Sequence, residues 1–359
     1  MSAAAERRAP LMACPAALHQ LPAPLLAWYD THQRGLPWRQ EVTPYRTWVS
    51  EIMLQQTRVN AAVPYFLRFM EAFPTVEALA SADTEKVLSL WQGLGYYRRA
   101  RHLQEAARMI CERWGGRFPA SYEEIMLLPG IGDYTAGAIL SIAFGQAVPA
   151  VDGNVLRVVS RITGFDGNVL EEKHRALLRG WTAEVLPSRR PGAFNQALMD
   201  LGAGVCVPNG QPQCEDCPAR DFCAAHQTGR ERSLPVREKN RSKRTETLTV
   251  FLLQREGRTA LRRRAEQGLL AGLWEYPHTP GHLEESAAAQ WLSEQGVVPH
   301  RWIKRVKGNH EFTHIRWEMT GYIVEVMGSG SPDWVWCDPA ERQSRAIPSA
   351  FGWLTKETE

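Results

Sequence analysis

Apolar side chains recur at helical spacing through much of the chain before residue 230. Between Arg58 and Phe73 they fall three or four residues apart, which places them on one face of a helix. Residues 103–114 and 193–202 repeat this spacing. The pattern predicts a mostly helical region that begins near Leu21.

One pair of helices in this region is expected to flank a glycine-rich turn. Ser121 followed by Glu124 forms a capping box, which predicts a helix that ends at the turn 128–132. A second helix is expected to run through Phe144, with Asp133 as its N-cap. The arrangement is a helix–hairpin–helix unit, whose glycines let backbone N–H groups approach a phosphate.

After residue 230 the pattern changes to short β-rich runs around one helix. The expected strands are Leu248–Leu253, Thr259–Arg262 and Ile315–Val326, and the helix is Glu284–Gln295. A basic stretch separates the two regions. We therefore predict a disordered extension at 1–20, a helical domain at 21–230, a linker at 231–245 and an α+β domain at 246–359.

Composition narrows the class of protein but does not identify a binding partner. The 359 residues are 44% hydrophobic and 23% charged, as in globular proteins. No run of eighteen apolar residues predicts a membrane helix, and the first residues lack the apolar core of a secretory signal. We expect a cytoplasmic protein with no membrane association. The net charge of +3 is too small to mark a nucleic-acid binder, so any basic footprint must be local.

Four of the seven cysteines lie within eighteen residues. They are spaced C-x7-C-x2-C-x5-C, at Cys206, Cys214, Cys217 and Cys223. Close thiols without a secretion signal indicate a metal centre rather than disulfides. Zinc sites usually pair two short knuckles, and only Cys214–Cys217 fits that spacing. The run favours a [4Fe–4S] cluster over zinc, with a structural role.

Two acidic residues are candidates for chemistry on a sugar. Glu51 has the apolar neighbours Trp48, Ile52 and Met53, and burial would raise its pKa and make it a usable acid. Asp152 precedes Gly-Asn, which is also typical of a helix N-cap. Together they suit glycosidic cleavage, in which one carboxyl protonates the leaving group and the other stabilises an oxocarbenium-like sugar.

Several motifs then resemble one family. They are Leu36–Arg39, Trp48–Thr57, Gly93–Tyr97, Leu128–Gly137, Val151–Val155, Asn195–Gly202 and the cysteine run. In this order they resemble adenine DNA glycosylases of the MutY type, within the helix–hairpin–helix superfamily, densely over residues 20–230. The resemblance implies a catalytic region of two helical subdomains with a [4Fe–4S] loop. It also implies a likeness of the C-terminal α+β domain to Nudix proteins.

The resemblance implies a substrate and residue roles. The substrate is adenine opposite 8-oxoguanine or guanine in duplex DNA, removed in base excision repair after the nucleotide is flipped out. Glu51 is expected to protonate adenine N7 and later to activate water, and Asp152 to stabilise the sugar cation, assisted by Tyr134 and Asn154. The base pocket would contain Trp38, Arg39 and Asp200. The DNA-contacting residues would be Gln56, Tyr96, Gly130, Gly132 and Thr135.

The resemblance also predicts what the protein does not do. Relatives similar to endonuclease III carry at position 134 a lysine that forms a Schiff base and cuts the strand. Tyr134 cannot do so, which implies a monofunctional glycosylase. In the C-terminal domain the acidic Nudix helix is absent, so we expect binding without hydrolysis. Phe312, Thr313 and His314 would read 8-oxoguanine, although the residues alone indicate only a hairpin.

Two departures from the family and two rival functions stay open. Seven residues separate Cys206 from Cys214, where many relatives have six, and Thr313 stands where serine is usual. One alternative is an endonuclease III-like glycosylase/lyase for oxidised pyrimidines. Another is a non-catalytic iron–sulfur redox sensor that binds DNA. The interpretation we adopt is a monomeric, bacterial, nucleoid-associated adenine glycosylase.

Overall fold

The computed structural model describes residues 12–238, 243–265, 267–312 and 314–357. Its contacts divide the chain into two compact units. The first comprises Met1–Ala80 and Glu105–Lys239, and the second comprises Ser81–Gln104 and Asn240–Glu359. The second unit thus includes a segment from within the region predicted as one helical domain.

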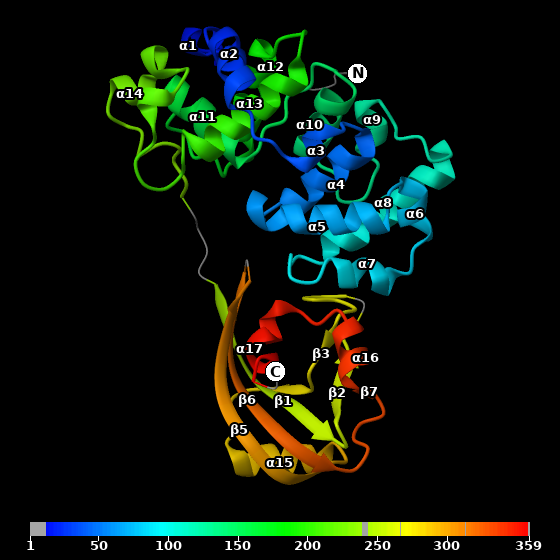
Figure 1. Ribbon diagram of the computed structural model, residues 1–359. Coiled ribbons are helices and arrows are strands. Elements are labelled where there is room, and N and C mark those ends of the chain that lie inside the picture. Colours follow the sequence, from blue (N-terminus) through cyan, green and yellow to red (C-terminus); the bar gives the residue numbers. More distant parts are fainter. Residues whose placement is uncertain (1–11, 239–242, 266, 313, 358–359) are drawn as a thin grey trace, which may run out of the picture. The chain divides into compact units, whose positions relative to one another are not determined.

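The chain is helical up to residue 227 (Figure 1). The helices are α1 Ala16–His19, α2 Pro22–His32, α3 Pro37–Gln40, α4 Pro44–Leu54, α5 Val59–Ala72, α6 Val76–Ser81, α7 Thr84–Leu90, α8 Arg98–Trp114, α9 Tyr122–Ile125, α10 Asp133–Ala143, α11 Gly153–Thr163, α12 Glu172–Val185, α13 Pro191–Gly204, η1 Cys214–Asp216, η2 Arg220–Phe222 and α14 Ala224–Gln227.

Two local predictions need correction. The extension expected at 1–20 is wrong for Ala16–His19, because α1 buries Leu18 completely in the core. The expected N-cap Asp133 is instead the first residue of α10, and Gly132 occupies the cap position. The capping serine is confirmed, since Ser121 Oγ accepts a hydrogen bond from the backbone N–H of Glu124 at 3.3 Å.

Close helix packing in the first unit positions the site. α10 packs against α4 and α13, and α11 packs against α13. The α11–α13 approach depends on Gly202, where a Cβ would lie 2.7 Å from the Cβ of Asn154. One apolar cluster joins α1, α2 and α10–α13, and Phe194 and Leu198 of α13 are fully buried in it.

The second unit contains a seven-stranded sheet with the order β3-β2-β1-β6-β5, to which β4 adds by pairing with β1 and β7 by pairing with β2. Its strands are β1 Arg244–Arg255, β2 Arg258–Arg263, β3 Trp274–Glu275, β4 His278–Pro280, β5 Val298–Glu311, β6 Ile315–Met327 and β7 Trp334–Cys337. The further helices are α15 Glu285–Glu294, α16 Pro339–Ser344, η3 Ser349–Phe351 and α17 Gly352–Thr355.

The predicted strands and helix of the second unit are present, and one long strand was not predicted. β1 and β6 pair in parallel, with Leu248 opposite Met319. The unpredicted strand, β5, pairs antiparallel with β6 along nearly its whole length. Separate buried clusters contain Phe351 and Tyr322, respectively, so the unit has two apolar cores.

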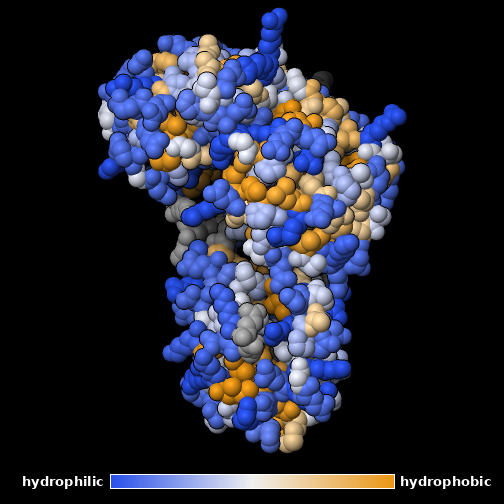
Figure 2. Space-filling view, in the orientation of Figure 1, coloured by the Kyte–Doolittle hydropathy of each residue, from blue (hydrophilic) through white to orange (hydrophobic). Residues whose placement is uncertain are grey.

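Among the described residues, no helix combines the length and the apolar character needed to cross a membrane. The face of the molecule in Figure 2 is largely hydrophilic and carries smaller hydrophobic areas. Most large apolar side chains are accordingly in the interior of the two units.

Candidate active site

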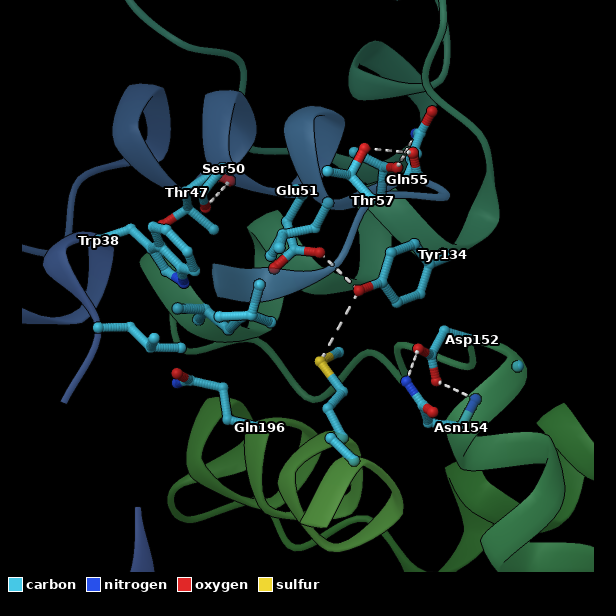
Figure 3. A pocket seen from close by; sticks show the side chains of 18 of the residues that line it. Trp38, Thr47, Ser50, Glu51, Gln55, Thr57, Tyr134, Asp152, Asn154 and Gln196 are labelled. Carbon is cyan, nitrogen blue, oxygen red and sulfur yellow. Dashed lines mark hydrogen bonds between the residues drawn. The ribbon is translucent and has the colours of Figure 1, made fainter. Parts of the chain in front are cut away.

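A cavity of about 610 Å³ lies in the first unit, where α4, α10, α11 and α13 meet (Figure 3). This volume is within the usual range for small-ligand pockets. The cavity brings together most of the residues predicted for catalysis and base binding, and three of those predicted to contact DNA. Those in its lining are Trp38, Arg39, Glu51, Gln56, Gly132, Tyr134, Thr135, Asp152 and Asn154.

Glu51 occupies the third turn of α4, and its burial is confirmed at 5% exposure. Tyr134 on α10 donates a hydrogen bond from its hydroxyl to Glu51 Oε2 at 2.5 Å. Burial raises the pKa of Glu51 to about 7, and the charge of Asp152 adds to this effect. The Tyr134 hydrogen bond and the positive charge of Arg39 act in the opposite direction. Glu51 can therefore hold a proton near neutral pH.

Asp152 is both a helix cap and a wall of the cavity. Its Oδ1 accepts hydrogen bonds from the backbone N–H groups of Asn154 and Val155, each at 2.8 Å. Its Oδ2 accepts another from the side-chain amide of Asn154 at 2.8 Å. Burial raises the pKa of Asp152 above its ordinary value, and these hydrogen bonds favour the anion. The expected cap and the expected anion are therefore the same group.

The hydrogen bonds continue from Asp152 toward the cysteine loop. Arg157 donates to Asn154 Oδ1 at 2.9 Å, to the Gly202 carbonyl at 2.7 Å and to the Cys206 carbonyl at 2.7 Å. One guanidinium thus joins the group that orients Asp152 to the first cysteine of the loop. Sequence reasoning gave no role to Arg157, because an arginine inside a helix carries no pattern of its own.

Asp200 has a different place from the one predicted. It is 2% exposed, and it accepts hydrogen bonds from Arg39 at 2.7 and 3.0 Å and from Arg34 at 2.5 and 2.8 Å. Burial would raise the pKa of Asp200, but these bonds hold it below its ordinary value. Asp200 therefore lies behind the cavity wall and fixes the two arginines, which line the cavity.

The glycine-rich turn leads directly into the first turn of α10. Gly130 has φ 78°, a conformation that favours glycine, and Gly132 precedes the first turn of α10. The first N–H groups of a helix have no acceptor within it. The Thr135 side chain is 2% exposed and its hydroxyl accepts a hydrogen bond from Gln55 at 3.4 Å, so any phosphate contact there would involve the backbone.

The two residues predicted to enter the duplex share an uncommon backbone conformation. Gln56 has φ 59° and Tyr96 has φ 51°, in the left-handed region that non-glycine residues rarely adopt. Such conformations concentrate at functional sites. Gln56 lines the cavity, whereas Tyr96 belongs to the second unit and is 49% exposed.

The cavity also contains side chains that were not predicted. They include Arg34, Thr47, Ser50, Gln55, Gln196 and Met199. Thr47 and Ser50 precede Glu51 by four and one residues, so helical spacing from the candidate acid could have identified Thr47. Gln196 and Met199 on α13 are distant in sequence from the candidate carboxylates, and no local pattern indicates them.

The four predicted cysteines line one small cavity of their own. Arg161, which is 3% exposed, donates to Cys206 Sγ at 3.2 Å, and the thiol of Cys223 donates to the Arg161 carbonyl at 3.4 Å. Four thiols around one cavity are a suitable donor set for a thiolate-bound metal centre. His226 and Glu231 also lie within 4.8 Å of the Cys214 thiol, which the spacing did not suggest.

The predicted reading triplet lies between β5 and β6. Phe312 packs against His310 and Trp317, with ring centroids 4.6 and 4.9 Å away, and its N–H donates to the Ile315 carbonyl at 2.8 Å. His314 is exposed, and Thr313 lies outside the described residues. Phe312 thus anchors the chain directly after β5 against an apolar core.

Comparison with known proteins identifies the class and then the family. Residues 49–184 match the HhH-GPD superfamily of base excision DNA repair proteins, and residues 249–356 match the NUDIX domain. An adenine DNA glycosylase of Rattus norvegicus is 36% identical, over 93% of this chain and 73% of the relative. One from Buchnera aphidicola (Schizaphis graminum) is 31% identical, over 84% and 86%. The chain belongs to the adenine DNA glycosylase family.

Solved structures support the fold of the helical region. A thermostable thymine-DNA glycosylase is similar with a TM-score of 0.54 and 27% identity, over 59% of this chain and 97% of that one. A non-covalent endonuclease III–DNA complex has a TM-score of 0.50 and 22% identity, over the same shares of the two chains. At that identity, the second likeness concerns the fold alone.

Proposed function

We propose that the protein removes adenine mispaired with 8-oxoguanine or guanine from duplex DNA, in base excision repair. The observation that carries this proposal is the pairing of a buried, protonatable Glu51 with Asp152 in one cavity. The cavity is large enough for an extruded purine, and the family acts on adenine in DNA.

In the proposed reaction Glu51 protonates N7 of the extruded adenine, which makes the base a better leaving group. As the N-glycosidic bond breaks, Asp152 stabilises the cation that develops at the sugar C1′. Asn154 holds the Asp152 carboxylate in place. Glu51, now ionised, then accepts a proton from the water that attacks C1′, which returns both carboxyl groups to their starting states.

We also propose that the enzyme is monofunctional. Strand cleavage through a Schiff base needs an unprotonated amine at the sugar. The side chain at the relevant position is the phenol of Tyr134, and in the described part of the chain no lysine lines the cavity. Borohydride treatment with an abasic duplex should therefore capture almost no protein. Efficient covalent capture would favour the endonuclease III-like alternative.

We propose that Cys206, Cys214, Cys217 and Cys223 hold a [4Fe–4S] cluster. Four thiolates are the usual ligands of such a cluster, which would here brace the loop after α13. The proximity of His226 and Glu231 to Cys214 keeps zinc as the alternative. Iron and sulfide analysis of anaerobically purified protein distinguishes them, because zinc without sulfide would contradict the cluster.

We assign recognition of 8-oxoguanine to the Nudix-like unit, at Phe312, Thr313 and His314. The exposed His314 on a hairpin anchored by Phe312 supports this assignment. We further propose that the protein acts as a monomer on chromosomal DNA in the cytoplasm, because both carboxyl groups come from one chain.

The test of function uses three duplexes, in which A is opposite 8-oxoguanine, G or T. Heating with alkali after incubation cleaves the strand wherever adenine has been released. We expect product to decrease in that order, with essentially none from A opposite T. Equal release from all three, or none from the first two, would overturn the proposal.

A further inference from the structure

The wall of the base cavity contains a polar group that has no role in the reaction described above. Thr47 is 2% exposed and lines the cavity one helical turn before Glu51 (Figure 3). Within the described structure, its hydroxyl has no hydrogen-bond partner. Buried polar groups are nearly always paired, so this hydroxyl requires an explanation.

The usual internal partner of a helical threonine is not used here. Such a hydroxyl commonly donates to the carbonyl four residues earlier, but among the described residues the Thr47 hydroxyl makes no such bond, and the Thr43 carbonyl accepts from the backbone N–H of Thr47 at 2.9 Å. Ser50, the neighbouring hydroxyl in the cavity wall, does follow the helical pattern, because it donates to the Thr47 carbonyl at 2.8 Å. Within the described structure the Thr47 hydroxyl is therefore a buried polar group without a partner beside the cavity.

The spacing of Thr47 and Glu51 matches one edge of adenine. Side chains four residues apart on a helix are neighbours on the same face, with Cβ atoms roughly 5–6 Å apart. One edge of adenine carries an acceptor, N7, beside a donor, the 6-amino group. When the longer Glu51 side chain reaches N7, the adjacent amino group faces the side of the cavity that holds Thr47.

We propose that Thr47 binds the extruded base by accepting a hydrogen bond from the adenine 6-amino group while Glu51 protonates N7. The inference rests on the proposed function, because it places adenine in this cavity. Tyr134 donates to Glu51, and Asp200 engages Arg39, so these two groups already have partners within the protein. Thr47 then satisfies its hydroxyl only when the base is bound, and it fixes N7 against the acid.

The experiment compares Thr47→Val with wild type on two substrates opposite 8-oxoguanine. One contains adenine, and the other contains purine, which lacks the 6-amino group. Valine keeps the branched shape of threonine and removes only the hydroxyl. Rates are measured in single-turnover conditions at subsaturating enzyme. We expect Thr47→Val to release adenine about tenfold more slowly than wild type does. On the purine substrate, we expect the variant and the wild type to have equal rates. Thr47→Ser keeps the hydroxyl and should restore most of the loss.

The outcomes separate this inference from the proposed function. Wild type that releases no adenine contradicts the function itself. If the wild type is active and Thr47→Val releases adenine at the same rate, the result contradicts only the role of Thr47. An equal loss on adenine and purine also overturns the role, because it indicates a change of cavity shape rather than a lost contact with the amino group. Equal thermal midpoints of the three proteins exclude misfolding as a cause.

Discussion

At the scale of single residues, the proposed reaction depends on the protonation of Glu51. The carboxyl belongs to a helix whose neighbouring side chains are apolar, and burial raises its pKa to about 7. This burial was predictable from Trp48, Ile52 and Met53. The hydrogen bond from Tyr134 was not, because 83 residues separate the two partners.

The raised pKa of Glu51 predicts how base release depends on pH. The acid is protonated below about pH 7, so the single-turnover rate should fall as pH rises through that value. The stability contributed by this group depends on pH in the same direction. The folded state binds the proton more tightly than the unfolded state, whose ordinary value is 4.5, so this group's contribution to stability is lost as pH rises from about 4.5 to about 7.

A pH–rate profile of adenine release checks the first expectation, and denaturation of wild type and Glu51→Gln across the same range checks the second. Glu51→Gln should remove this part of the pH dependence of stability. A rate that increases steadily above pH 7 would contradict the assignment of Glu51 as the acid.

Replacement of Tyr134 by Phe should move the midpoint of the pH–rate profile to higher pH. The Tyr134 hydroxyl lowers the pKa of Glu51 by stabilising the anion, so its removal leaves burial less opposed. Tyr45→Phe is the matched control, because Tyr45 donates to the Phe73 carbonyl at 2.8 Å rather than to Glu51. The measurement is the midpoint of the pH–rate profile. Equal midpoints for Tyr134→Phe and wild type would contradict the coupling.

At the scale of secondary structure, helices were easier to predict than their roles. Repeated apolar spacing predicted α5 to within one residue at each end. The strand β5 was not predicted, because its exposed and partly buried positions do not alternate cleanly and many of its residues are charged. Its pairing with β6 comes from tertiary context, which a local pattern does not contain.

The contact between α10 and the chain before α11 predicts a large effect of one methyl group. A Cβ at Gly137 would lie 2.2 Å from the Pro149 carbonyl oxygen. Gly137→Ala should therefore destabilise the protein by roughly 1–3 kcal/mol or more through overpacking. Gly180→Ala in α12 meets nothing within 4 Å and should stabilise it by about 0.5–1 kcal/mol. Thermal unfolding measures both, and equal shifts would contradict the packing.

The hydrogen bonds that Arg157 makes between α11 and the cysteine loop predict that its loss affects both base release and stability. Its replacement by Ala leaves Asn154 Oδ1 and the Cys206 and Gly202 carbonyls without this donor, and an unpaired buried group such as the Gly202 carbonyl costs about 1–3 kcal/mol. We expect slower base release together with lower thermal stability. Arg157→Lys should recover only part of both, because an ammonium cannot reproduce the guanidinium fork. If Arg157→Ala keeps the stability and the rate of the wild type, the proposed role of these hydrogen bonds is contradicted.

At the scale of the whole molecule, residues distant in sequence build the site. Glu51 comes from α4, Tyr134 from α10 and Asp152 from the N-cap of α11, and the ordered series of family motifs allowed their convergence to be expected. The same resemblance placed Asp200 in the base pocket, whereas the structure uses it to hold Arg34 and Arg39. Motif order thus predicts which residues lie around one cavity better than it predicts what each side chain touches.

The Nudix-like unit should control discrimination between mispairs. His314→Ala removes an exposed side chain, so folding should be unaffected. We expect the preference for A opposite 8-oxoguanine over A opposite G to fall by up to about tenfold, as for one lost base contact. Single-turnover rates on the two duplexes, with enzyme in excess of DNA but below saturation, measure this ratio. An unchanged ratio would remove His314 from the recognition site.

The proposed reaction requires Glu51 and Asp152 to act together on one extruded deoxyadenosine. Its most direct test is single-turnover adenine release from an A:8-oxoguanine duplex by wild type, Glu51→Gln and Asp152→Asn, with DNA binding measured in parallel. We predict that each variant still binds the duplex while its rate falls by roughly 10²–10⁴-fold for the acid and by roughly 10²–10³-fold for the anion. A wild-type rate in either variant would contradict the claim.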